Sequence, residues 1–146
     1  MDRRAELADR EVEVWAEFEA ALAGVPEDRW EVEGILPGWS VKDLVRHVAG
    51  WLEDCVRQLG YMREGTFEEP NDSPPVVDAK NAAFAEEARA MTTSEVRSGL
   101  VSARELVRAR WAELPAIDDA AIEWFVGETF EHYEEHLPEL RRFAGD

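Results

Sequence analysis

The sequence contains few of the residues on which several common functions depend. Its 146 residues include one cysteine, Cys55, and three histidines, His47, His132 and His136. A single cysteine excludes an intramolecular disulfide and the paired CxxC motifs of zinc and redox proteins. Lysine and arginine are also scarce, 16 against 33 aspartates and glutamates, which leaves a net charge of −17. This charge argues against binding to nucleic acid or to an anionic membrane, since both need a basic surface.

Long apolar stretches are absent as well. No segment approaches the ~20 apolar residues needed to span a bilayer. The first twenty residues carry charges throughout, unlike a secretory signal peptide. We therefore expect a cytoplasmic protein that does not enter a membrane. A chain of 146 residues, 45% of them hydrophobic and six of them tryptophan, suits a single folded domain spanning residues 1–146.

The hydrophobic pattern predicts helices. Apolar residues recur every three or four positions, and no strand-like alternation of useful length is present. Turn signals divide the chain into helical blocks at about 7–23, 40–60, 78–114 and 119–143, the third of them with a break at Thr92–Thr93. We predict an all-α, single-domain four-helix bundle.

One linker and one helix start are predicted in more detail. Residues 65–75 are rich in Gly, Asn, Asp, Ser and Pro and form the one long linker. This segment is long enough to run the length of a bundle, as a crossover between the second and third helices that leaves them parallel. Ser40 and Asp43 have the spacing of a capping box, and Trp39 has the position of a hydrophobic staple.

The three histidines are the strongest candidates for a functional site. His132 and His136 form an H-x-x-x-H pair one helical turn apart, so their imidazoles can reach the same ion. His47 lies at the edge of the apolar stripe of the second helix, and bundles often build metal sites from facing helices. Buried histidines also occur without a metal, as ordinary core residues. From the spacing alone, both explanations stay open.

These motifs, taken in order, resemble a known superfamily. Pro37–Leu44, followed by His47 and Trp51, resembles the GWS/T-v-x-D-l-x-x-H stretch of the DinB/YfiT-like superfamily. Thr129–His136 resembles the closing H-x-x-x-H helix of that superfamily, and Asp78–Asn81 resembles the Asn-bearing start of its third helix. The order and spacing agree from about residue 10 to residue 143. Within the superfamily, the chain resembles the mycothiol-dependent maleylpyruvate isomerase N-terminal domain and the ClbS/DfsB-like proteins.

The resemblance implies a four-helix bundle that holds a divalent metal (Zn, Ni, Mn or Fe) through His47, His132 and His136. Members with known activity include thiol-dependent transferases and isomerases that use mycothiol, bacillithiol or glutathione. The resemblance therefore implies a small electrophile as substrate and a low-molecular-weight thiol as cosubstrate. Three protein ligands leave one position open for water or substrate, which is a catalytic arrangement. Pro138 is a departure, because it lies two residues after His136 and is expected to kink the helix.

Three further residues near the histidines are weaker candidates. Glu128, one turn before His132, would orient an imidazole or act as a general base, although a solvated glutamate is the simpler explanation. Trp51, one turn after His47, would form a pocket wall, although ordinary packing is the simpler explanation. Cys55 lies some 12 Å along the helix from His47, too far to share the metal, and we expect a buried inert thiol.

Three functions stay open at this point. The first is a metal-dependent transferase or isomerase that uses a thiol. The second is a protective, small-ligand-binding protein of the ClbS/DfsB-like branch, without an obligatory metal. The third is an interaction module that forms a homodimer through a spare face of the bundle. The acidic composition fits all three.

Overall fold

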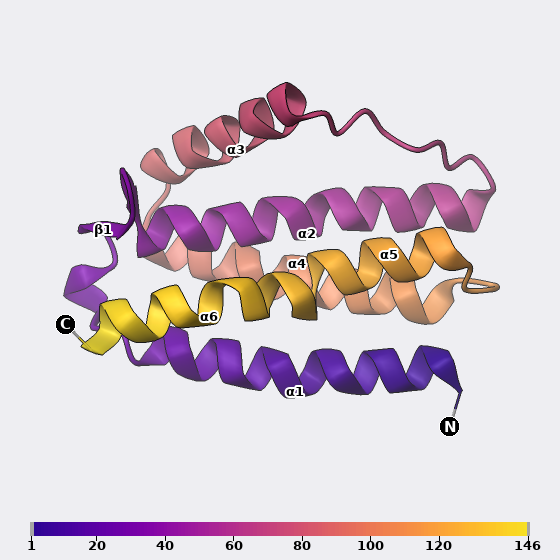
Figure 1. Cartoon of the computed structure of the whole chain (residues 1–146), viewed down its shortest axis with the longest axis horizontal. Coiled ribbons are helices and arrows are strands. Elements are labelled where there is room, and N and C mark those ends of the chain that lie inside the picture. The colour runs from indigo at the N-terminus through magenta and orange to yellow at the C-terminus, as the bar shows by residue number, and fades with distance from the viewer. Residues whose placement is uncertain (1, 146) are drawn as a thin grey trace.

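The structure is a computed structural model that describes residues 2–145, and it is mostly helical (Figure 1). A small antiparallel hairpin lies between the first two helices. In chain order the elements are α1 (Arg3–Ala23), a 3₁₀ turn (Glu27–Arg29), β1 (Glu33–Leu36), β2 (Trp39–Ser40), α2 (Val41–Glu64), α3 (Pro74–Arg89), α4 (Thr93–Glu113), α5 (Asp119–Glu128) and α6 (Phe130–Gly145). No helix in the described part of the chain is long and apolar enough to cross a membrane.

Local sequence signals explain where α2 begins and ends. The predicted capping box is confirmed, because the Ser40 hydroxyl accepts from the Asp43 amide and the Asp43 carboxylate accepts from the Ser40 amide. The helix does not end near Gly60 as predicted. It continues to Glu64 and ends where Gly65 adopts the left-handed conformation, with φ of 76°, a backbone shape that glycine accepts without strain.

The chain between α2 and α4 differs from the predicted extended crossover. The linker is shorter than expected, because the prolines at the start of α3 begin a helix at Pro74. The predicted break at Thr92 is confirmed, with a second capping box between Thr92 and Glu95. Residues 65–73 and α3 together return the chain from the end of α2 to the start of α4 (Figure 1). Helix α3 therefore packs mainly against α2, outside the other helices.

The predicted last helix is divided in two at Thr129. Its backbone leaves the helical region, with φ of −103° and ψ of −105°. The Thr129 hydroxyl donates a 2.6 Å hydrogen bond to the Phe125 carbonyl, a type of bond that often bends helices. Pro138, where a kink was predicted, lies inside α6, which continues through this residue. The break at Thr129 sets the direction in which α6 presents its side chains.

The hairpin β1–β2 was not predicted, because the segment is too short to show alternation. Leu36 pairs with Trp39 and Glu33 pairs with Ser40. The turn contains Gly38 with φ of 77°, a left-handed conformation that favours glycine. The hairpin leads directly into α2 and holds Trp39 beside the first turns of that helix.

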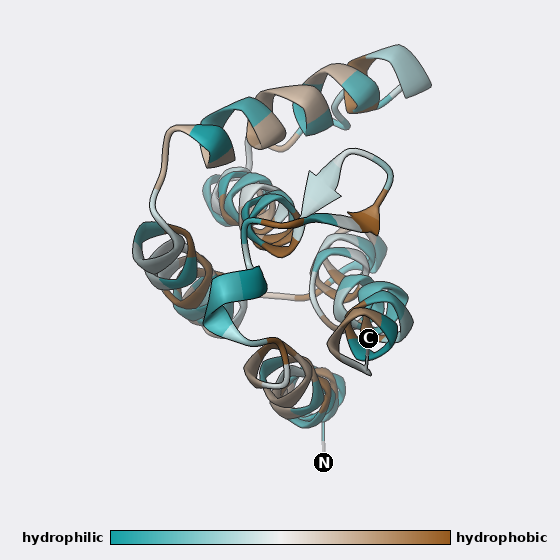
Figure 2. Ribbon diagram, turned by 90° about the vertical axis from the view of Figure 1, so that its left-hand side faces the viewer, coloured by the Kyte–Doolittle hydropathy of each residue, from teal (hydrophilic) through white to brown (hydrophobic). Residues whose placement is uncertain are grey.

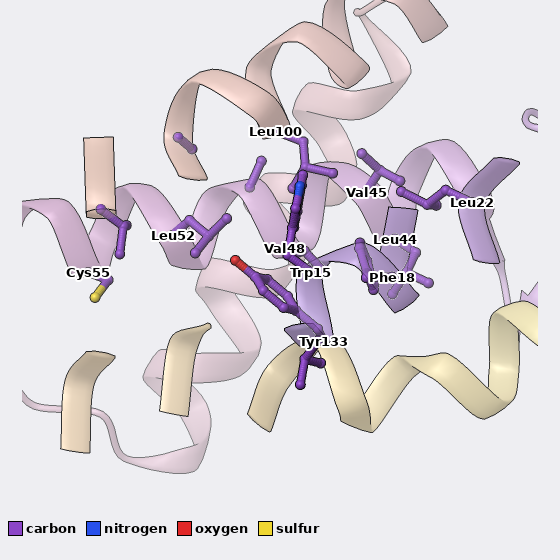
Figure 3. Close-up of a cluster of buried hydrophobic side chains, with 14 of the residues drawn as sticks. Trp15, Phe18, Leu22, Leu44, Val45, Val48, Leu52, Cys55, Leu100 and Tyr133 are labelled. Atoms are coloured by element: carbon purple, nitrogen blue, oxygen red, sulfur yellow. The ribbon is translucent and has the colours of Figure 1, made fainter. Parts of the chain in front are cut away.

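One hydrophobic core joins the helices. Viewed along their axes, the hydrophobic faces turn toward the space between the helices (Figure 2). An aromatic group at the centre comprises Trp15 and Phe18 from α1 and Tyr133 from α6, with the Tyr133 ring centroid 5.3 Å from each of the other two (Figure 3). Apolar side chains of α2 and Leu100 of α4 surround this group.

A buried charged group lies on the other side of Tyr133. Glu11 of α1 is fully buried. Its carboxylate accepts hydrogen bonds of 2.9 and 2.7 Å from Arg104, of 2.9 Å from Arg108 and of 2.9 Å from the Tyr133 hydroxyl. These contacts satisfy a charge that would otherwise be costly to bury. These hydrogen bonds connect α1 with α4 and with α6.

Candidate metal centre

The three histidines meet in space. His47 lies in the second turn of α2, and His132 and His136 lie one turn apart on α6. The Nε2 atom of His132 is 3.0 Å from Nε2 of His47 and 3.1 Å from Nε2 of His136. One nitrogen from each ring lies within 4.8 Å of the others. All three side chains are buried, between 6% and 8% exposed.

This geometry fits a divalent metal. Imidazole nitrogens that bind one ion at 2.0–2.1 Å lie about 2.9–3.4 Å apart in tetrahedral or octahedral coordination. The distances from Nε2 of His132 to Nε2 of His47 and of His136 fall in this range. Three ring nitrogens that face one another have too few protons to satisfy each other fully by hydrogen bonds. A cation at their centre would satisfy all three lone pairs.

The Nδ1 atoms, which are the outer nitrogens of the three rings, differ in their hydrogen-bond partners. Nδ1 of His136 lies 2.7 Å from Oε2 of Glu139. A proton on that Nδ1 leaves the Nε2 lone pair directed toward the other two histidines, as a metal ligand requires. Nδ1 of His47 and Nδ1 of His132 are buried and have no hydrogen-bond partner among the described residues.

The environment keeps two of the rings neutral. Burial, together with the neighbouring His47 and His136, lowers the pKa of His132 to about 2. Burial and His136 also lower the pKa of His47 to about 4, while the adjacent Asn81 opposes this change. Metal binding requires deprotonated imidazole. At neutral pH these two rings are therefore already in the form that binds a metal.

A cavity of about 450 Å³ opens beside the histidines. Its aromatic wall consists of Trp39 from the hairpin and Trp51 from α2. The Trp39 ring lies 5.0 Å from the His47 ring between centroids. Trp51 Nε1 donates a 2.7 Å hydrogen bond to Oδ1 of Asn81, which α3 brings to the cavity. Both tryptophans therefore face the same space as the three histidines.

Glu128, the last residue of α5, also lines this cavity. Burial, together with the charges of Asp54, Asp72 and Glu135, raises its pKa to about 8, against a smaller opposite effect of Lys80. The side chain is half-buried. A carboxyl with this pKa exchanges a proton near neutral pH, which distinguishes it from an ordinary solvated glutamate.

Cys55 lies outside the site. It is fully buried in the core, and its thiol lies 3.5 Å from the Trp124 carbonyl oxygen. Burial raises its pKa, and the charges of Glu128 and Asp54 add to this effect. The thiol therefore stays protonated and is a poor nucleophile, in agreement with the expectation from the sequence.

Sequence reasoning missed several residues of the site. Glu139 follows His136 by three positions, and this spacing on one helix face was a signal that could have identified it. Trp39 was interpreted only as a staple, although it also lines the cavity. Glu135 follows His132 by three positions, so the same spacing was a signal for it as well. Asp72 carried no local signal, because only the packing of the linker brings it to the cavity.

Comparison with known families identifies the chain. The family model described as "Mycothiol maleylpyruvate isomerase N-terminal domain" matches residues 12–131. This range includes His47 and ends one residue before His132, so the geometry of α6 provides independent information on the other two histidines. Comparisons with curated proteins and with solved structures returned no match. Because the matched range covers most of the chain, the protein belongs to the mycothiol maleylpyruvate isomerase N-terminal domain family, within the DinB/YfiT-like superfamily.

Proposed function

We propose that this protein is a divalent-metal-dependent enzyme that transfers a low-molecular-weight thiol to a small electrophile, or isomerises that electrophile with the help of the thiol. The observation that carries the proposal is the convergence of the Nε2 atoms of His47, His132 and His136. The family, whose description names mycothiol, supports a thiol as cosubstrate. The adjoining cavity supports a small organic substrate.

The three histidines would hold the metal through their Nε2 atoms. A divalent ion with three protein ligands supplies Lewis-acid chemistry and favours the thiolate form of a bound thiol. Three imidazoles are compatible with Zn, Ni, Mn or Fe and do not choose among them. Glu139 would keep His136 in the required tautomer through the contact at Nδ1.

The other cavity residues would bind substrate and move a proton. Trp39 and Trp51 offer flat apolar surfaces on which a small electrophile can lie. Asn81 holds the Trp51 ring through the hydrogen bond to Nε1. Glu128 would act as general acid and base, because a carboxyl with a pKa of about 8 can both give and take a proton near neutral pH.

We also interpret the fold as the four-helix bundle of the superfamily. In this interpretation α1, α2, α4 and the pair α5–α6 are the four bundle helices. The linker 65–73 and α3 would then be the crossover between the second and third of them. The shared hydrophobic core of these helices and the outer position of α3 support this assignment.

The metal content of protein purified without a histidine tag tests the proposal. Inductively coupled plasma mass spectrometry should find close to one divalent ion per chain in the wild type and almost none in His132→Ala. An Arg57→Ala variant, changed at an exposed position of α2, serves as the control and should keep the metal. The loaded protein would then be screened with mycothiol, bacillithiol or glutathione and a panel of electrophiles. Absence of metal, with no uptake of added Zn or Ni, would overturn the proposal and favour a metal-free ligand-binding function.

A further inference from the structure

The cavity beside the histidines is lined by several acidic side chains. Asp72, Glu128 and Glu135 line it, together with the three histidines and the aromatic wall. None of the cavity-lining residues that the structure describes is a lysine or an arginine. The cavity therefore holds several carboxylates and no side chain that can pair with an anionic ligand.

The nearest cation is already engaged. Nζ of Lys80 on α3 lies 3.0 Å from Asp72 and 3.4 Å from Asp54. It also lies 5.1 Å from the centre of the Trp51 ring. Lys80 therefore offsets Asp72 and Asp54, whereas Glu128 and Glu135 form no salt bridge with any described residue.

A carboxylate cluster alone would not indicate a ligand, but this one shares its cavity with an independent feature. The three Nε2 atoms converge there, and Nδ1 of His132 and Nδ1 of His47 are buried without partners. Burial and, after it, the neighbouring carboxylates raise the pKa of Glu128, so its ionised form lacks a positive partner in the cavity. A positive charge placed in the cavity would favour the ionised form of Glu128 and gain from that interaction.

We propose that the cavity selects a ligand that carries a protonated amine over one that carries a carboxylate in the same position. The apolar part of that ligand would lie against Trp39 and Trp51, and the amine would lie near Glu128 and Glu135. This inference rests on the proposed function, since it describes the specificity of the same site. The amine can belong to the thiol or to the electrophile, and the test separates these two sources.

Isothermal titration calorimetry on zinc-loaded protein tests the inference, after zinc content has been checked. The first arm compares 2-aminoethanethiol, 2-mercaptoethanol and 3-mercaptopropionate. The second arm compares benzylamine, benzyl alcohol and benzoate in saturating 2-mercaptoethanol. In at least one arm, affinity should decrease in the order amine, neutral, carboxylate. The arm that shows this order identifies the thiol or the electrophile as the source of the amine.

Variants that lack one cavity carboxylate test the effect of cavity charge. A carboxylate ligand can also bind zinc directly, but this binding is the same in all variants. Glu128→Gln and Glu135→Gln should each reduce the preference for the amine over the neutral ligand by about 3- to 10-fold, as expected for charges about 6 Å apart in a partly solvated site. Glu131→Gln, at an exposed position of the same helix α6 outside the cavity, should leave the preference unchanged.

The outcomes are distinguishable from failure of the proposed function. If zinc does not bind to the wild type, the proposed function fails before the specificity is tested. If zinc binds but neither arm prefers the amine, the inference is wrong while the metal site stands. If the glutamine variants lower zinc affinity without changing the preference, the carboxylates serve only to attract the metal, and the inference is again wrong. Glu135 lies at the exposed rim, so its variant should fold normally even if Glu128→Gln does not.

Discussion

The Nδ1 atom of His136 lies 2.7 Å from Oε2 of Glu139, three residues further along α6. This contact holds the ring with its Nε2 atom toward His132, at 3.1 Å. It is the only contact of this kind that the described residues make to the outer nitrogen of a site histidine. The tautomer of His136 is therefore determined by Glu139, and that of the other two rings is not.

Removal of this carboxylate should weaken metal binding. We expect Glu139→Ala to lower zinc affinity about 10- to 100-fold, the range typical for partners that orient a ligand histidine. Glu139→Gln should lose less, because its amide oxygen can still accept from Nδ1. Competition with a chromogenic chelator measures the affinity, with Glu131→Ala as a surface control on α6. Equal affinities in Glu139→Ala and Glu131→Ala would show that the contact does not orient the ring.

Acid should destabilise the metal-free protein through its buried histidines. His47 and His132 have pKa values of about 4 and about 2 in the folded state, below the ordinary value of 6.5. As the pH falls below 6.5, the unfolded chain binds protons at these positions and the folded chain does not, so stability is lost. Each histidine should account for about 2 kcal/mol between pH 7 and pH 5.

Urea unfolding of metal-free protein at several pH values measures this effect. The His132→Gln variant should lose less stability on acidification than the wild type, because one of the two histidines is gone. The comparison between the two proteins cancels the contribution of other titrating groups, Glu128 included. A parallel loss in both would mean that His132 titrates normally in the folded state.

Glu11 should be more important for stability than its neighbours on α1. Replacement of Glu11 by alanine removes the acceptor for Arg104, Arg108 and the Tyr133 hydroxyl. Breaking one side of a buried charge network typically costs about 3–5 kcal/mol. The free energy of unfolding in urea measures the loss. Glu13→Ala, whose side chain is 69% exposed, should change stability by roughly 0.5 kcal/mol or less, and similar losses in both variants would contradict this prediction.

The docking of α3 should depend on Gly50. A Cβ atom at this position would lie 2.5 Å from ring atoms of Phe84, so Gly50→Ala should displace Phe84 and loosen α3. Amide hydrogen exchange in residues 74–89 should become faster, since this helix packs mainly against α2. At Gly60, on the same helix, a Cβ meets nothing within 4 Å. Gly60→Ala should therefore stabilise the protein by roughly 0.5–1 kcal/mol without changing exchange in α3, and unchanged exchange in both variants would show that α3 tolerates the larger residue.

Local features of the site and fold were predictable from the sequence because each depends on neighbours within one turn. The capping boxes at Ser40 and Thr92 are examples, and so is the pairing of His132 with His136 on one helix face. The absence of a second cysteine also sufficed to exclude an intramolecular disulfide. The homodimer and the cytoplasmic location stay predictions.

Only the tertiary structure decided which distant residues complete the site. The approach of His47 to His132 depends on how α2 packs against α5 and α6, and the break at Thr129 sets the direction of α6. Asp72 and Asn81 reach the cavity because α3 folds back along α2, which the predicted extended linker did not include. The charge and the aromatic wall of the cavity follow from these long-range contacts. Sequence spacing cannot determine such contacts, because they depend on packing between helices rather than on the geometry of one helix.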